Sequence, residues 1–229
     1  MFFKILQYLR KLVGKFGYSV MPKIELAKIC GLAVKQCCPT RWWTDWLMCE
    51  RFMEIHAKDK DAINKVINIC GWKKNFQKMK EADFELISYF VDFFKVMKIK
   101  SDILAGEESA TLHMVHSSVR EIQKNIRKWK NRPVIGSFAE DFDKEFSSYF
   151  DFIVNTSHAN YDKIFAVAAY LSPFHHGTLS NDEKKIVKDY LHLEVSLMDG
   201  GVSTSEVSGG SPESGPVEPA SDNMIPGIL

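Results

Sequence analysis

Residues 112–129 read LHMVHSSVREIQKNIRKW, and this stretch decides the fold class. A helix with about 3.6 residues per turn aligns residues spaced three and four apart into one stripe. The apolar residues of the stretch step three, four, three, four and three: Leu112, Val115, Val119, Ile122, Ile126 and Trp129. The pattern predicts an amphipathic helix that packs this stripe against a core and leaves its other faces polar and basic.

The same period recurs through most of the chain. Apolar helical faces are expected over residues 2–16, 42–56, 83–104, 138–153 and 186–193, and shorter helices over 22–30, 63–70 and 161–171. No stretch alternates as a strand would, and no internal repeat is found. The sequence therefore predicts eight or nine helices in an all-α, irregular helical bundle.

Local signals place several helix boundaries. Ser137–Glu140 and Ser180–Glu183 both read as capping boxes, which predict helix starts. Thr40 is expected to be the N-cap of the tryptophan-rich helix. Pro133 should end the helix over 112–129, and Gly71 should end or bend the helix over 63–70.

Composition changes abruptly near the C-terminus. Residues 199–229 are rich in Gly, Ser and Pro, and they contain five of the 29 acidic residues and no Lys or Arg. Such a segment has too few apolar residues to offset its chain entropy. We expect a helical domain over 1–198 with a mild basic bias, followed by a disordered acidic tail over 199–229.

Cysteine usage and hydropathy bear on location. The five cysteines are an odd number and lie in the first third of the chain, with no secretory signal before them. Reduced thiols in a nuclear or cytoplasmic protein are the simplest interpretation. No run approaches eighteen uninterrupted apolar residues, so no membrane partner is expected.

Motifs for enzymatic chemistry are missing. The sequence shows no phosphate-cradling glycine loop, no Cys-x-x-Cys pair and no His-Glu-x-x-His helix. The only close cysteine pair, Cys37 and Cys38, is adjacent, which seldom lets both sulfurs reach one zinc ion. We therefore expect no catalytic residue, no metal site, no cofactor and no small-molecule substrate.

A basic run is the first candidate for binding. Lys124, Arg127, Lys128 and Lys130 surround Trp129. Nucleic-acid surfaces combine cations for phosphates with aromatic rings for bases. Trp129 belongs to the apolar stripe, however, and a solvated helix face is the alternative interpretation.

The second candidate is the segment CPTRWWTDWLMCERFME, residues 38–54. Three tryptophans lie within five residues, next to Arg41 and at an expected helix N-terminus. Arg41 could hold a phosphate there, and Trp42 could stack on a base. The other interpretation is that these rings fill a core.

This segment resembles the Thr-Arg-Trp signature of hAT-superfamily transposases, with Trp43 in place of the usual Asn. Other stretches, both before and after this segment, are similar to the family and occur in the same order. Together they extend over about residues 8–195. The last of them, Ala166–Pro173, departs from the family, because Ser172 replaces an Asp and Phe174 replaces an Arg. The resemblance implies the helical insertion domain of a ribonuclease H-like transposase core.

The resemblance also implies what this chain should lack. The family holds two divalent metal ions with two Asp before the insertion and a Glu after it, and none of these carboxylates is matched here. We expect a transposon-derived, catalytically incomplete protein with residual DNA binding through Arg41 and Trp42. The alternative is a helical module that binds a protein partner and makes no contact with DNA.

Overall fold

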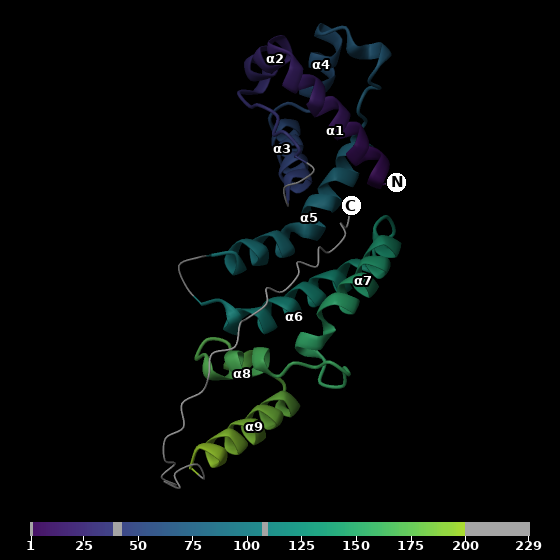
Figure 1. Ribbon diagram of the computed structural model, residues 1–229. Coiled ribbons are helices and arrows are strands. Elements are labelled where there is room, and N and C mark those ends of the chain that lie inside the picture. The colour runs from purple at the N-terminus through teal and green to yellow at the C-terminus, as the bar shows by residue number, and fades with distance from the viewer. Residues whose placement is uncertain (1, 39–42, 107–109, 200–229) are drawn as a thin grey trace, which may run out of the picture. The chain divides into compact units, whose positions relative to one another are not determined.

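The computed structural model describes residues 2–38, 43–106 and 110–199. Within these ranges the chain forms nine α-helices, two short 3₁₀ turns and no strand, which confirms the all-α prediction (Figure 1). The elements are α1 (Phe2–Tyr18), α2 (Val20–Cys30), α3 (Thr44–Lys58), α4 (Ala62–Ile69), η1 (Trp72–Lys74), α5 (Glu81–Leu104), α6 (Leu112–Trp129), α7 (Gly136–Val154), α8 (Ile164–Leu171), η2 (His176–Thr178) and α9 (Asn181–Asp199).

Backbone contacts divide the chain into Met1–Asp189 and Tyr190–Leu229, and the division falls inside α9. Of the second part, Tyr190–Asp199 are described, and they continue α9 by nearly three turns. The predicted disordered tail over 199–229 lies outside the described residues, apart from Asp199, which ends α9.

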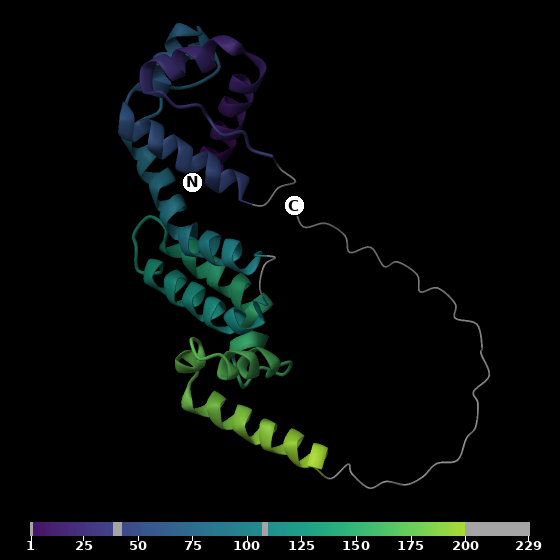
Figure 2. The same ribbon diagram turned by 90° about the vertical axis from the view of Figure 1, so that its left-hand side faces the viewer.

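Two apolar clusters build the first part, and α5 contributes to both. The first cluster joins α1 to α4 with the beginning of α5, where Phe84 and Ile87 are buried. The second joins the middle of α5 to α6 and α7. Phe93 of α5 is fully buried there and makes edge contacts with aromatic rings of α6 and α7. The long helix α5 therefore links the two clusters (Figures 1 and 2).

The helix over 112–129 has the predicted bounds and the predicted inner face. Val119, Ile122 and Ile126 of α6 are buried, and Val115 and Trp129 pack against the same cluster. α6 lies beside α7 and α8 in both views (Figures 1 and 2). This packing fixes which side of α6 remains for binding.

Two predicted helix starts are wrong. α3 begins at Thr44, after Trp43, which adopts a left-handed backbone (φ 65°) and donates from Nε1 to Ser101 Oγ at 3.0 Å, so Thr40 is not its N-cap. α7 begins at Gly136, before the expected capping box at Ser137, and has no side-chain cap. The tight connection from α6 sets this start. A Cβ atom at position 136 would lie 2.3 Å from the carbonyl oxygen of Lys130.

Three other boundary predictions are confirmed. α6 ends before Pro133, and α4 ends before Gly71, whose φ is 69°. Ser180 and Glu183 form the expected capping box at the start of α9: Glu183 N donates to Ser180 Oγ at 3.3 Å, and Ser180 N donates to Glu183 Oε2 at 2.7 Å. None of the described helices is long and apolar enough to cross a membrane.

Candidate nucleic-acid interface

A row of cations runs along the outer side of α6. Arg120, Lys124 and Arg127 are spaced four and three residues apart, so they share one face of the helix. At about 1.5 Å per residue the row extends about 10 Å along the helix axis. This face is remote from the apolar stripe, so the packing that buries Ile122 and Ile126 turns the cations outward.

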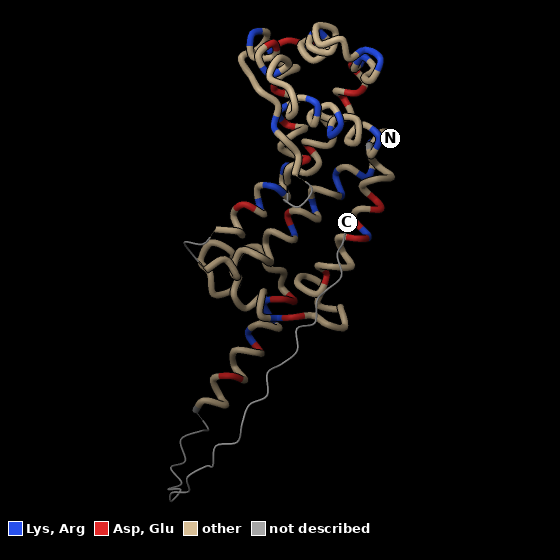
Figure 3. Tube along the Cα trace, turned by 45° about the horizontal axis from the view of Figure 1, so that its top comes forward, with Lys and Arg blue, Asp and Glu red and all other residues tan. Residues whose placement is uncertain are grey.

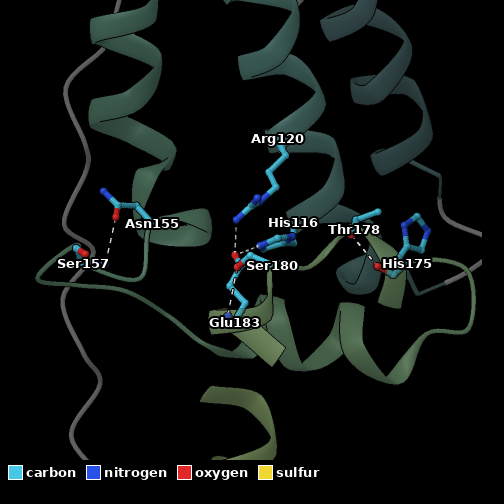
Figure 4. Close-up of polar contacts among 8 residues, drawn as sticks. All are labelled: His116, Arg120, Asn155, Ser157, His175, Thr178, Ser180 and Glu183. Carbon is cyan, nitrogen blue, oxygen red and sulfur yellow. Dashed lines mark hydrogen bonds and ion pairs between the residues drawn. The ribbon is translucent and has the colours of Figure 1, made fainter. Parts of the chain in front are cut away.

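These cations form one wall of a groove between α6 and the end of α7. The groove has a volume of about 530 Å³, and the opposite wall carries Asp151, Val154 and Asn155. Gln123 lies between the walls and donates from Nε2 to Asp151 Oδ1 at 2.9 Å. Asn155 Oδ1 accepts a hydrogen bond from Ser157 N at 3.1 Å (Figure 4). We call this feature the α6/α7 groove.

The basic run predicted from the sequence divides into two kinds of residue. Lys124, Arg127 and Lys128 are exposed, and none of the three has an ion-pair partner among the described residues. Lys130 is half-buried and forms an ion pair with Asp143 at 2.5 Å. Its charge is therefore neutralised within the fold. Figure 3 shows Lys and Arg interspersed with Asp and Glu along most helices.

A buried polar cluster fixes Arg120, the first cation of the row. Glu183 is fully buried and accepts hydrogen bonds from His116 Nε2 and Arg120 Nη2, both at 2.7 Å. Ser180 binds the second carboxylate oxygen through both its backbone N–H and its hydroxyl group. Figure 4 shows His116 and Arg120 extending from α6 toward Ser180 and Glu183. Arg120 is therefore held by Glu183 and also lines the α6/α7 groove.

The cluster keeps Glu183 ionised. Burial alone would raise the pKa of Glu183, but the hydrogen bonds from His116 and Ser180 outweigh it and lower the pKa to about 2. A charged carboxylate in the interior is tolerated because it is fully hydrogen-bonded and paired. Glu183 therefore joins the first turn of α9 to α6 at any pH near neutral.

The other DNA-binding candidates from the sequence and the groove residues overlap only in part. Arg41 and Trp42 lie outside the described residues. The groove residues Arg120, Gln123 and Asp151 were not among the sequence candidates. The position of Arg120, four residues before Lys124 and seven before Arg127, could have indicated it. No local signal points to Asp151, which comes from the next helix.

The cysteine-rich region does not offer a second site. All five cysteines are thiols, and no group of three or more His, Cys, Asp or Glu side chains in the described residues is arranged as a metal site. Cys37 donates to Asp45 Oδ1 at 2.9 Å, and Asp45 also binds Arg10. Burial and this carboxylate raise the pKa of the Cys37 thiol, which disfavours the reactive thiolate.

The described residues thus define an all-α protein with a basic, partly enclosed groove between two helices. Comparisons with protein-family models, with curated proteins and with solved structures found no match to this chain.

Proposed function

We propose that this chain is a transposon-derived, catalytically incomplete, hAT transposase-like protein that binds DNA, and that the α6/α7 groove makes the contact. An all-α arrangement is what the resemblance implies for the insertion region of that family. The DNA contact predicted at Arg41 and Trp42 stays a prediction from the sequence, and the groove is argued and tested independently of it.

One observation carries the proposal. Three exposed cations of α6, Lys124, Arg127 and Lys128, have no ion-pair partner among the described residues, and two of them line a groove together with Arg120. Cations that are already paired contribute little to phosphate binding, because an existing partner must first be displaced. Unpaired cations in a row attract a polyanion and release its condensed counterions.

The test is salt-dependent binding of fluorescent DNA oligonucleotides by the full chain, measured by anisotropy. The double variant Lys124→Gln, Arg127→Gln should bind more weakly. It should also lower the slope of log affinity against log salt by about 1.4 on a single strand, or about 0.7 for each phosphate that is no longer neutralised. The matched control is Lys95→Gln, Lys188→Gln, which removes two exposed cations outside the groove that likewise have no ion-pair partner among the described residues.

The control decides between a groove and a general charge effect. A decrease in affinity and slope only in the groove variant supports the proposal. Equal decreases in both variants, or no decrease in either, would contradict the proposal that the groove contacts DNA. Catalytic incompleteness is tested separately: pure protein with Mg²⁺ or Mn²⁺ should not nick a terminal-inverted-repeat substrate, since two-metal cleavage needs several converging carboxylates.

A second candidate function is supported by the end of α9. Leu193 and Leu197 lie one turn apart on the same face of α9 and are 58% and 64% exposed. An amphipathic helix with an uncovered apolar face fits a protein partner that offers an apolar groove. A photoreactive residue at position 193 should then form a crosslink to one protein partner. DNase treatment should leave this crosslink unchanged, whereas Leu197→Asp should abolish it. If the crosslink survives Leu197→Asp, this alternative fails.

A further inference from the structure

The two walls of the α6/α7 groove have opposite chemistry. The α6 wall carries Arg120, Lys124 and Arg127, whereas the α7 wall carries the carboxylate of Asp151. Among the described residues the Asp151 carboxylate accepts one hydrogen bond, from Gln123, and no cation pairs with it. A carboxylate accepts at two oxygens with about four lone-pair positions, so Asp151 can accept further hydrogen bonds from a ligand.

This arrangement restricts the ligand. A group placed against Asp151 must donate hydrogen bonds, because a phosphate or a carbonyl oxygen there would be repelled. A group placed against Lys124 and Arg127 must be anionic. A ligand that satisfies both walls therefore has phosphate on one side and N–H donors on the other.

The size of the groove points the same way. Its volume of about 530 Å³ lies within the range of about 300–1,000 Å³ that is typical of sites for small organic ligands. One nucleotide is of that size, whereas a DNA duplex presents only phosphates and sugars along its outside and keeps its base edges within its grooves. Because Asp151 lines a recess between two helices, a base edge can reach it only when the base is unpaired and enters the groove.

We propose that the α6/α7 groove binds a nucleotide of single-stranded DNA, with its phosphates toward Lys124 and Arg127 and the amino group of its base toward Asp151. This inference rests on the proposed DNA-binding function and adds its ligand class. Cytosine, adenine and guanine carry an exocyclic amino group. Thymine instead presents a carbonyl oxygen where cytosine presents its amino group, and its one free N–H, at N3, lies between two carbonyl oxygens that the Asp151 carboxylate would repel. The groove therefore discriminates against thymine.

The decisive probes are oligo-dC and oligo-dT of equal length, whose bases differ in the group on C4, the hydrogen on N3 and the methyl group on C5. The wild-type chain should bind oligo-dC more tightly, on the order of tenfold, because a hydrogen bond to a carboxylate replaces a repulsive contact. It should also bind oligo-dC more tightly than the same sequence in a duplex. Equal binding of oligo-dC and oligo-dT, or tighter binding of the duplex, would overturn the inference.

Two variants of Asp151 assign the effect to this residue. Asp151→Asn keeps an acceptor for Gln123 but adds an amide donor, so the preference for oligo-dC should vanish or invert while the salt slope stays the same. Asp151→Glu keeps the carboxylate and should keep the preference. Asp141→Asn, at an exposed α7 position outside the groove, is the control and should change nothing. A preference that persists in Asp151→Asn would show that another residue reads the base.

The outcomes separate the inference from the function on which it rests. Binding that depends on Lys124 and Arg127 but ignores the base would leave the proposed function standing and remove the inference. Binding that depends on neither cation would remove the proposed function itself. Competition with dCMP distinguishes a DNA strand from a free nucleotide as the ligand. If dCMP displaces oligo-dC at concentrations near the Kd of oligo-dC, the claim that the ligand is a DNA strand is overturned.

Discussion

Replacing Glu183 with Gln removes one buried negative charge and leaves the size of the side chain nearly unchanged. In the native chain the carboxylate accepts hydrogen bonds from His116, Arg120 and Ser180. Its pKa falls from 4.5 to about 2. Each pKa unit is worth about 1.4 kcal/mol, so the ionised form stabilises the fold by about 3 kcal/mol at neutral pH. Removing one partner of a buried ion pair typically costs about 3–5 kcal/mol, which agrees.

The pH dependence has a definite sign. Because the folded pKa is lower than the unfolded one, the stabilisation is complete above about pH 4.5 and is lost as the pH falls toward 2. We expect Glu183→Gln to lower the free energy of unfolding by about 3 kcal/mol near pH 7. The difference from wild type should shrink to about half of that near pH 3, because the unfolded wild type then binds a proton at Glu183 that the folded form does not, and this proton uptake favours unfolding.

Urea unfolding followed by circular dichroism, across a series of pH values, measures this difference. Glu140→Gln is a suitable control, because Glu140 is an exposed residue of α7 and its replacement should change stability by less than about 0.5 kcal/mol. A difference for Glu183→Gln of less than about 1 kcal/mol at neutral pH would refute the reasoning. So would a difference that does not change on acidification.

Three further predictions concern packing and the thiols. Phe93→Ala should lower the free energy of unfolding by about 3–5 kcal/mol, because a fully buried ring with several aromatic neighbours is removed; a decrease below about 1 kcal/mol in denaturant would contradict the burial. Gly136→Ala should destabilise the fold by about 1–3 kcal/mol, because its Cβ would meet the Lys130 carbonyl oxygen. Gly14→Ala has open space around it in α1, so it should be neutral or stabilise by up to about 1 kcal/mol. The melting temperatures of the two variants would show whether the signs differ. Cys49 should react with a thiol reagent only after unfolding, since it is buried and burial raises the pKa of its thiol, and rapid labelling of Cys49 in the native chain would be inconsistent with this core.

Helix content and the inner face of α6 follow from the sequence alone. The three-and-four spacing from Leu112 to Trp129 depends only on helix geometry, so it can be recognised without knowing the partner helices. The capping box at Ser180 and Glu183 is equally local, because four successive residues contain both partners. These features were predictable because their cause lies within a few residues of chain.

The α6/α7 groove and the start of α7 depend on tertiary structure. Gly136 begins α7 because the chain must turn back close to the Lys130 carbonyl, and that contact overrides the capping signal at Ser137. Lys130 resembles Lys124 in sequence, but Asp143 neutralises only Lys130. Glu183 contacts His116, which is 67 positions away in the sequence, and Asp151 of α7 lines the same groove as Lys124 of α6. A charge on a periodic sequence indicates exposure, but its partner is set by packing between helices, and only that packing decides which cations remain available to a ligand.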